Sequence, residues 1–142
     1  MEPQAVADKV RDVMFADDAA SKMLGMQIAE ISPGRAVLNM TVRADMLNGF
    51  AICHGGLIAT LADSAFAFAC NSRNALTVAS GFGIDILKSA KLNDVLTATA
   101  EETSLAGRTG LYDITVRNQN GDLIAMFRGR SYRLGERKVF EA

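Results

Sequence analysis

The sequence has almost no net charge, and it lacks the basic surface that would hold nucleic acid. Its 142 residues include 15 Lys or Arg and 16 Asp or Glu, for a formal net charge of −1 at pH 7. The two signs are scattered, and no run of Lys or Arg marks a basic tail. Electrostatic binding to nucleic acid needs clustered positive charge, so the composition argues against that class of function.

Cysteine and histidine are also scarce. The chain has two cysteines, Cys53 and Cys70, and a single histidine, His54. These are too few ligands for a zinc site of standard spacing, and no CxxC pair occurs, so we expect no metal site. A disulfide framework is equally unsupported. The cysteine usage therefore favours a reducing compartment, and we expect a cytoplasmic protein.

Long hydrophobic runs are absent as well. The N-terminal residues carry charges such as Glu2 and Arg11 and lack the apolar core of a signal peptide. The longest apolar-rich run, residues 57–70, spans 14 positions and contains Asp63. Such a run is too short for a membrane span and predicts a buried helix.

What is present is the composition of one globular domain. Hydrophobic residues make up 49% and charged residues 22% of the chain, an ordinary balance for a domain of this length. No internal repeat or linker divides it, so we expect a single domain over residues 1–142. Residues 5–15 place apolar side chains at helical spacing, and Asp17 or Asp18 is positioned to cap a second short helix ending at Gly25. Residues 1–24 are thus predicted to be an N-terminal helical segment.

Six further segments are predicted to be strands. They alternate apolar and polar residues or are rich in Val, Ile, Thr and Phe, and turn signals such as Pro33-Gly34 and Ala106-Gly107 separate them. The predicted strands are residues 26–31, 36–42, 76–88, 95–104, 111–117 and 123–134. The links after the third strand are too short for helical crossovers, which predicts antiparallel pairing.

Residues 57–71 are predicted to form a central helix. Eleven of the 14 positions from 57 to 70 are apolar, so nearly the whole circumference of this helix must be hidden. Five alanines keep it thin enough for strands to wrap closely around it. This pattern agrees with an α+β hotdog fold, in which a curved antiparallel sheet wraps around one long central helix.

The polar residues on this helix share one stripe. With i, i+3, i+4 spacing, the stripe comprises Gly56, Thr60, Asp63, Ser64, Ala67 and Asn71. A carboxylate on an apolar helix is unfavourable unless it is hydrogen-bonded, paired or used, and desolvation raises its pKa, which improves it as a base. The alternative is that Asp63 serves a hydrogen-bond network at a subunit contact or points to solvent.

The loop before the helix favours the functional interpretation. Asn48, His54, Gly55 and Gly56 directly precede it, and backbone N–H groups at a helix N-terminus form a natural oxyanion site. Glycine at that point removes the side chain that would keep a ligand carbonyl from the amide.

The motifs around these residues resemble those of one family. The chain is similar to the PaaI-type thioesterases of phenylacetic acid degradation, which are hotdog-fold acyl-CoA thioesterases, over roughly residues 20–135. The similar motifs are MLNG at 46–49, CHGG at 53–56, LADSAFAFACNS at 61–72, IDILK at 84–88, DVLTATA at 94–100 and FRGRS at 127–131. Two positions depart from the pattern: Phe50 stands where many relatives have a histidine, and Ser89 where a proline is common.

The resemblance implies hydrolysis of an aryl-acyl-CoA, of the phenylacetyl-CoA or hydroxyphenylacetyl-CoA type, to free acid and CoA in phenylacetate catabolism. It implies that Asp63 acts as nucleophile or general base and that the N–H of Gly55 binds the thioester oxygen. Asn48 would help place the reacting carbonyl or water, and His54 would support the loop or the thioester. The expected substrate- or CoA-binding residues are Gly56, Ser64 and Lys88. No cofactor is expected, since CoA is part of the substrate.

The spacing of two of these residues predicts a dimer. Gly55 and Asp63 are eight positions apart, so they are separated by roughly 12 Å along a helix axis. One thioester cannot easily reach both on the same helix, whereas antiparallel helices from two subunits would bring them together. We expect a homodimer with two shared sites, and the resemblance suggests a homotetramer built as a dimer of dimers.

Other functions remain as alternatives. Hotdog acyl-thioester dehydratases and hydratases use a histidine with a carboxylate, and the position of the single His54 before the glycines argues against that class. A non-catalytic acyl-CoA-binding module is a further alternative. The presence of both Asp63 and the Gly55 loop argues against it. A Cys53–His54 nucleophile is disfavoured because neighbours on a loop rarely face each other and no third orienting group is evident.

Several basic residues are candidates for the phosphates of CoA, which require cationic contacts. They are Lys88, Lys91, Arg108, Arg128 and Arg130. For any single one the expectation is a solvated charge at a strand end, and Lys88 is favoured because it follows the resembling stretch at residues 84–87.

Overall fold

The elements follow the predicted order along the chain, and a computed structural model describes residues 1–141. The elements are α1 (Pro3–Ala16), α2 (Ala19–Met23), β1 (Gln27–Ser32), β2 (Arg35–Thr41), the 3-10 turn η1 (Ala44–Met46), α3 (Gly55–Asn71), β3 (Thr77–Ile86), β4 (Val95–Ala106), β5 (Thr109–Arg117) and β6 (Leu123–Arg133). The largest difference for the site is that α3 begins at Gly55, two residues before the predicted start. Both glycines therefore belong to its first turn.

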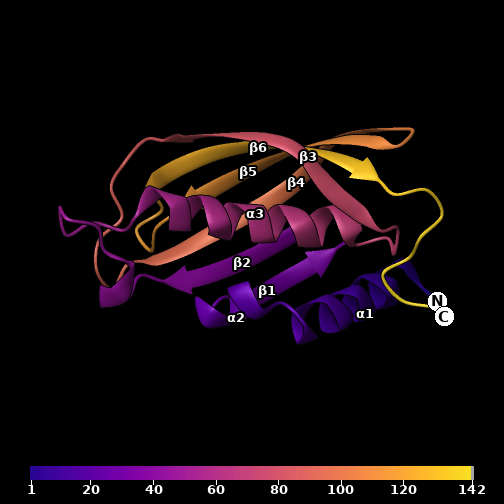
Figure 1. The fold of residues 1–142 in the computed structure, drawn as a ribbon, viewed down its shortest axis with the longest axis horizontal. Helices are drawn as coiled ribbons and strands as arrows, with labels where there is room; N and C mark the ends of the chain where they lie inside the picture. The colour runs from indigo at the N-terminus through magenta and orange to yellow at the C-terminus, as the bar shows by residue number, and fades with distance from the viewer. Residues whose placement is uncertain (142) are drawn as a thin grey trace.

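The six strands form one antiparallel sheet in the order β1-β2-β4-β5-β6-β3. Figure 1 shows α3 lying across this curved sheet, which confirms the predicted hotdog fold. The antiparallel directions are as predicted, but β3 does not lie beside β4, which follows it in the chain. Residues 87–94 carry the chain across the sheet, so that β3 pairs with β6 at the far edge.

Aromatic side chains join α3 to the concave face of the sheet. The ring of Phe66 lies 5.5 Å from that of Tyr112 on β5 and 6.1 Å from that of Phe127 on β6, measured between centroids. Gly129 makes this close approach possible, because a Cβ at that position would lie 2.7 Å from the nearest carbon of Phe66. The helix is thus held against the sheet by interdigitated rings.

The N-terminal helices pack beside β1 and α3, as Figure 1 shows along one edge of the molecule. Ala7 and Val10 of α1 are buried, and the side chain of Gln4 donates to the carbonyl oxygen of Ile31 at 2.7 Å. Asp18 caps α2 by accepting a hydrogen bond from the N–H of Ser21 at 3.1 Å. The predicted cap is therefore Asp18 rather than Asp17.

One side of α3 stays partly open in the single chain. Asp63 and Ala67 are half-buried, so the prediction that nearly the whole helix is hidden is wrong for one chain. The sheet ends at β3, where Phe82 stacks on Phe127 at 4.7 Å and is still 50% exposed. Ile86 on the same strand is 47% exposed, so this edge carries apolar surface that a single chain does not cover. Among residues 1–141 no helix has the length and apolar character needed to cross a membrane.

Candidate active site

Asp63 lies on α3 at the wall of an open groove. The groove has a volume of about 370 Å³ and runs between the C-terminal half of α3 and the start of β3. Its lining is mostly apolar and includes Phe66 and Ala67 of the helix, residues 76–79 at the start of β3, and Val139 of the C-terminal segment. A carboxylate thus faces a space suited to an apolar group.

Burial raises the pKa of Asp63 above that of an ordinary aspartate, and the negative charge of Asp18 raises it further. Both causes act by disfavouring the ionised form. A carboxylate with a raised pKa takes up a proton more readily, which suits a general base acting on water.

A chain of hydroxyl groups connects the turn that bears Asp63 to α2. The Oγ atom of Ser64 lies 2.8 Å from Oγ of Ser21, and the Ser21 hydroxyl lies 2.7 Å from Oδ2 of Asp18. Since the carboxylate of Asp18 can only accept, Ser21 donates to it and Ser64 donates to Ser21. The hydroxyl of Ser64, a predicted substrate-binding group, is therefore directed to α2. The sequence signalled Asp18 as a cap, but it carried no signal for Ser21.

The N-terminus of α3 presents unsatisfied backbone donors. His54 is the N-cap residue and makes no side-chain capping hydrogen bond. Its carbonyl oxygen accepts from the N–H groups of Leu57 and Ile58, whereas the amides of Gly55 and Gly56 precede the first intrahelical bond. A Cβ on Gly55 would lie 2.8 Å from Cδ1 of Ile86. The glycine therefore has a packing reason as well as a chemical one.

Asn48 shapes the loop before this helix. Its Oδ1 atom accepts hydrogen bonds from the N–H of Phe50 at 2.9 Å and of Ile52 at 3.4 Å. Its backbone N–H donates to the carbonyl oxygen of Ile52 at 2.8 Å. The side-chain oxygen is therefore engaged within the loop, and the amide N–H₂ is the part that can act on a ligand.

His54 and Cys53 do not form a nucleophile pair. The thiol of Cys53 is buried and contacts the backbone carbonyl oxygen of His54 at 3.7 Å, while the imidazole is exposed. Burial also raises the pKa of the Cys53 thiol, which keeps it protonated. Within residues 1–141 no group of three or more His, Cys, Asp or Glu side chains is arranged to hold a metal ion.

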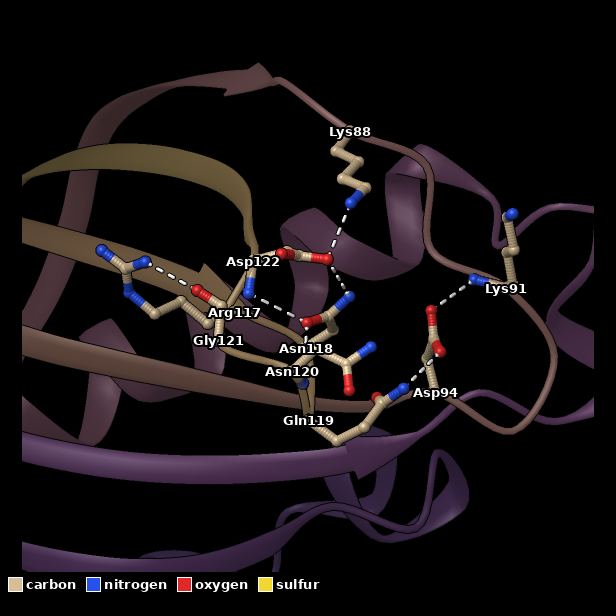
Figure 2. A network of polar contacts seen from close by, with 9 residues as sticks. All are labelled: Lys88, Lys91, Asp94, Arg117, Asn118, Gln119, Asn120, Gly121 and Asp122. Atoms are coloured by element: carbon tan, nitrogen blue, oxygen red, sulfur yellow. Dashed lines mark hydrogen bonds and ion pairs between the residues drawn. The ribbon is translucent and has the colours of Figure 1, made fainter.

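Lys88 already has an anionic partner. Its Nζ atom lies 2.7 Å from Oδ2 of Asp122, which also accepts from the side chain of Asn118 (Figure 2). Beside this pair, Asp94 accepts from the backbone N–H of Lys91 at 2.8 Å. The Lys88–Asp122 pair is solvent-exposed, and such pairs are weak. Asp122 therefore competes with a phosphate for the charge of Lys88.

The single chain brings together only part of the predicted site. Asn48, His54, Gly55 and Gly56 gather at the N-terminal end of α3. Asp63 and Ser64 lie two turns further along the helix, and Lys88 follows the far end of β3. Asp63 and the amide of Gly55 therefore occupy separate positions on one face of the chain.

Comparisons with known proteins give consistent matches. Residues 50–125 match the family described as the thioesterase superfamily. The acyl-coenzyme A thioesterase PaaI of Escherichia coli strain K12 is 48% identical over 122 residues, covering 86% of this chain and 87% of that protein. The solved structure of the E. coli PaaI protein from the phenylacetic acid degradation operon has a TM-score of 0.92 and 44% identity, covering 94% of this chain and 97% of that one. A Streptococcus mutans protein solved with acetyl CoA bound has a TM-score of 0.76 and 27% identity, covering 80% of this chain and 91% of that one.

Proposed function

We propose that this chain, which belongs to the thioesterase superfamily, hydrolyses an acyl-CoA thioester to the free acid and CoA. The observation that carries the proposal is Asp63, a half-buried carboxylate of raised pKa that faces an apolar groove. The uncapped amides at the start of the same helix supply the second requirement, a donor for the thioester oxygen.

The acyl group in this proposal is aromatic, of the phenylacetyl or hydroxyphenylacetyl type, and the reaction belongs to phenylacetate catabolism. The E. coli relative that is 48% identical is named for this operon and for acyl-CoA hydrolysis. The groove at Asp63 supports an aryl group, because its lining is apolar and includes the ring of Phe66.

The active unit in this proposal is a homodimer, with two such dimers forming a tetramer. Asp63 of one chain would work with Gly55 of the partner subunit, because the two lie at opposite ends of a helix segment. The partly open stripe of α3 and the exposed apolar residues Phe82 and Ile86 support an interface at β3. An uncovered strand edge with apolar side chains is surface that a second chain can pair with.

The proposed reaction has two parts. The N–H of Gly55 donates to the thioester carbonyl oxygen and stabilises the negative charge that develops there. The carboxylate of Asp63 either attacks the carbonyl carbon or removes a proton from an attacking water. The C–S bond then breaks and CoA leaves as the thiolate. When Asp63 activates water, this step releases the acid directly; when Asp63 attacks, a water molecule hydrolyses the acyl–Asp63 anhydride, which releases the acid and restores the carboxylate. The side-chain N–H₂ of Asn48 would orient the carbonyl or the water. No cofactor takes part, and the proposed location is the cytoplasm.

A test of this function is release of free CoA thiol from phenylacetyl-CoA, ring-hydroxylated phenylacetyl-CoA and straight-chain acyl-CoAs. We expect Asp63→Asn, which keeps the shape of the side chain and removes its charge, to lower kcat by at least about a hundredfold. Asp12→Asn, on the exposed face of α1, is the matched control and should equal wild type. Unchanged hydrolysis in Asp63→Asn would refute the assignment. Binding of phenylacetyl-CoA without thiol release would instead identify a non-catalytic acyl-CoA module.

A further inference from the structure

A second cavity lies at the C-terminal end of α3 and is lined in part by the turn of the β4–β5 hairpin. Figure 1 shows this hairpin at that end of the molecule. We call this second cavity the distal cavity. It has a volume of about 280 Å³. Its lining includes Cys70 and Thr77, which also line the groove at Asp63, and the polar residues Arg73, Arg108, Ser131 and Arg133. Three arginines therefore line one partly open space.

Two of these arginines have no compensating charge within residues 1–141. Arg73 pairs with Glu102, a carboxylate that also accepts from the hydroxyl of Tyr112 at 3.3 Å. The guanidinium groups of Arg108 and Arg133 have no hydrogen-bond or ion-pair partner among the described side chains. No carboxylate is part of the lining. Arg133 is partly buried and Arg108 is exposed at the rim, so neither positive charge is paired by the described lining.

The side chain of Arg133 has a buried donor that no acceptor of the described chain satisfies. Its Nε atom is buried and has no hydrogen-bond partner in the described chain. A buried donor without an acceptor is unfavourable. A water molecule could satisfy the Nε–H of Arg133, but it would leave the charge of this partly buried guanidinium without a counter-charge. A carboxylate or phosphate meets both needs, because its oxygens accept from the planar guanidinium in a bidentate geometry.

The distal cavity adjoins the groove at Asp63. Cys70 and Thr77 line both spaces. Asp63 and Cys70 are seven residues apart on α3, which corresponds to about 10 Å along the helix. Two hydrogen bonds between the Asn71 side chain and the backbone of Thr77 join α3 to β3 at this point. An anionic group of a substrate held at Asp63 would pass beside this contact to reach Arg133.

We propose that the distal cavity binds an anionic group of the thioester substrate, either a carboxylate at the far end of the acyl group or a phosphate of CoA. This inference rests on the proposed function, since it assigns a second contact to the substrate of the Asp63 site. Arg133 and Arg108 would be specificity-determining residues, whereas the bond-breaking step stays at Asp63.

The experiment uses four thioesters: hexanoyl and adipoyl groups, each carried on CoA and on N-acetylcysteamine, which has no phosphate. Wild type, Arg133→Gln and Arg108→Gln are compared by kcat/KM. Arg117→Gln, an exposed arginine on β5 whose side chain donates to the carbonyl oxygen of Gly121, is the matched control. Arg133→Lys retains the charge and should recover part of any loss.

The two sources of the anion give different results. If the acyl carboxylate binds, Arg133→Gln lowers the adipoyl-to-hexanoyl ratio of kcat/KM about tenfold on both carriers, the effect of one charge-assisted hydrogen bond. If a CoA phosphate binds, the CoA-to-N-acetylcysteamine ratio falls instead, for both acyl groups. The proposal is overturned if both ratios in Arg133→Gln and Arg108→Gln equal those of Arg117→Gln.

Failure of the proposed function can be told apart from failure of this inference. If wild type hydrolyses none of the four thioesters, the thioesterase assignment fails. Titration calorimetry with adipoyl-CoA and CoA then still tests the cavity, because Arg133→Gln should bind at least one of them about tenfold more weakly than wild type. Equal affinities would refute the anion site. Arg108 lies in an exposed hairpin turn, so Arg108→Gln is the variant to measure if Arg133→Gln does not fold.

Discussion

At the residue scale, the proposed chemistry depends on how the surroundings of one carboxylate alter its proton affinity. Asp63 is half-buried, and its pKa is raised first by burial and then by the charge of Asp18. Asp18 lies outside α3, in the N-terminal helical segment. The hydroxyl of Ser21 links it to Ser64, the residue that follows Asp63 in the sequence. The N-terminal segment thus influences the residue that we assign to the reaction.

We expect Asp18→Asn to move the acidic limb of the kcat/KM–pH profile to lower pH. Removing the negative charge of Asp18 makes ionisation of Asp63 easier, so the pKa of Asp63 falls. Asparagine remains a good helix cap, so α2 should persist. Ser21→Ala is the control, because it breaks the hydroxyl chain and keeps the charge. An acidic limb at the same pH in Asp18→Asn and wild type would show that Asp18 does not act on Asp63.

The raised pKa of Asp63 also predicts an effect on stability. The folded protein binds this proton more tightly than the unfolded chain, so the free energy of unfolding falls as pH rises from the unfolded pKa through the folded one. We therefore expect Asp63→Asn to be more stable than wild type at neutral pH. The difference should vanish below the ordinary pKa of an aspartate, where Asp63 is protonated in both states. Urea unfolding at the two pH values measures this, and a variant less stable than wild type at neutral pH would contradict it.

At the scale of elements, two close approaches to the sheet position α3. Gly129 on β6 faces the ring of Phe66, and Gly55 at the start of α3 faces Ile86 of β3. Both contacts join residues far apart in the sequence. Gly55 and Gly129 both lie in motifs of the sequence, but only Gly55 had a role assigned to it. The packing role of Gly129 could not be assigned, because the partner ring of a glycine is known only once helix and sheet are packed.

We expect Gly129→Ala to lower the free energy of unfolding by about 1–3 kcal/mol, the usual cost of overpacking a core. The new Cβ would lie 2.7 Å from the Phe66 ring, which is fixed between Tyr112 and Phe127. Gly83→Ala on β3 is the matched control, because a Cβ there meets no atom within 4 Å. Urea unfolding of both variants tests this, and equal stability losses would show that the Phe66 contact is not limiting.

At the scale of the whole molecule, we propose that the site is completed by a second chain. Gly55 and Asp63 lie two turns apart on α3, and the edge strand β3 leaves Phe82 and Ile86 about half exposed. A partner that pairs along this edge would cover those side chains and bring its own Gly55 toward Asp63. The inferences about oligomeric state and catalysis are therefore linked.

We expect two inactive variants to restore activity when mixed. In a heterodimer of Asp63→Ala and Gly55→Val, one of the two shared sites keeps both Asp63 and an open Gly55 amide. Random subunit exchange makes half of the dimers mixed, so the mixture should recover about a quarter of wild-type activity. Thiol release after verified exchange is the measurement. No recovery would mean that each site is built from one chain.

The sequence by itself determined the order of the elements, the hotdog fold and the family, because hydrophobic periodicity and the motif spacing are local properties of the chain. It also identified the catalytic candidates Asp63, Gly55 and Asn48. It did not show that β3 pairs with β6, or that Asn71 of the predicted polar stripe is buried between α3 and β3. Nor did it show that Ser64 contacts Ser21, or that three arginines line the distal cavity. Only the tertiary structure decided these, because each depends on contacts between residues distant in the sequence, and such contacts leave no periodic signal in it.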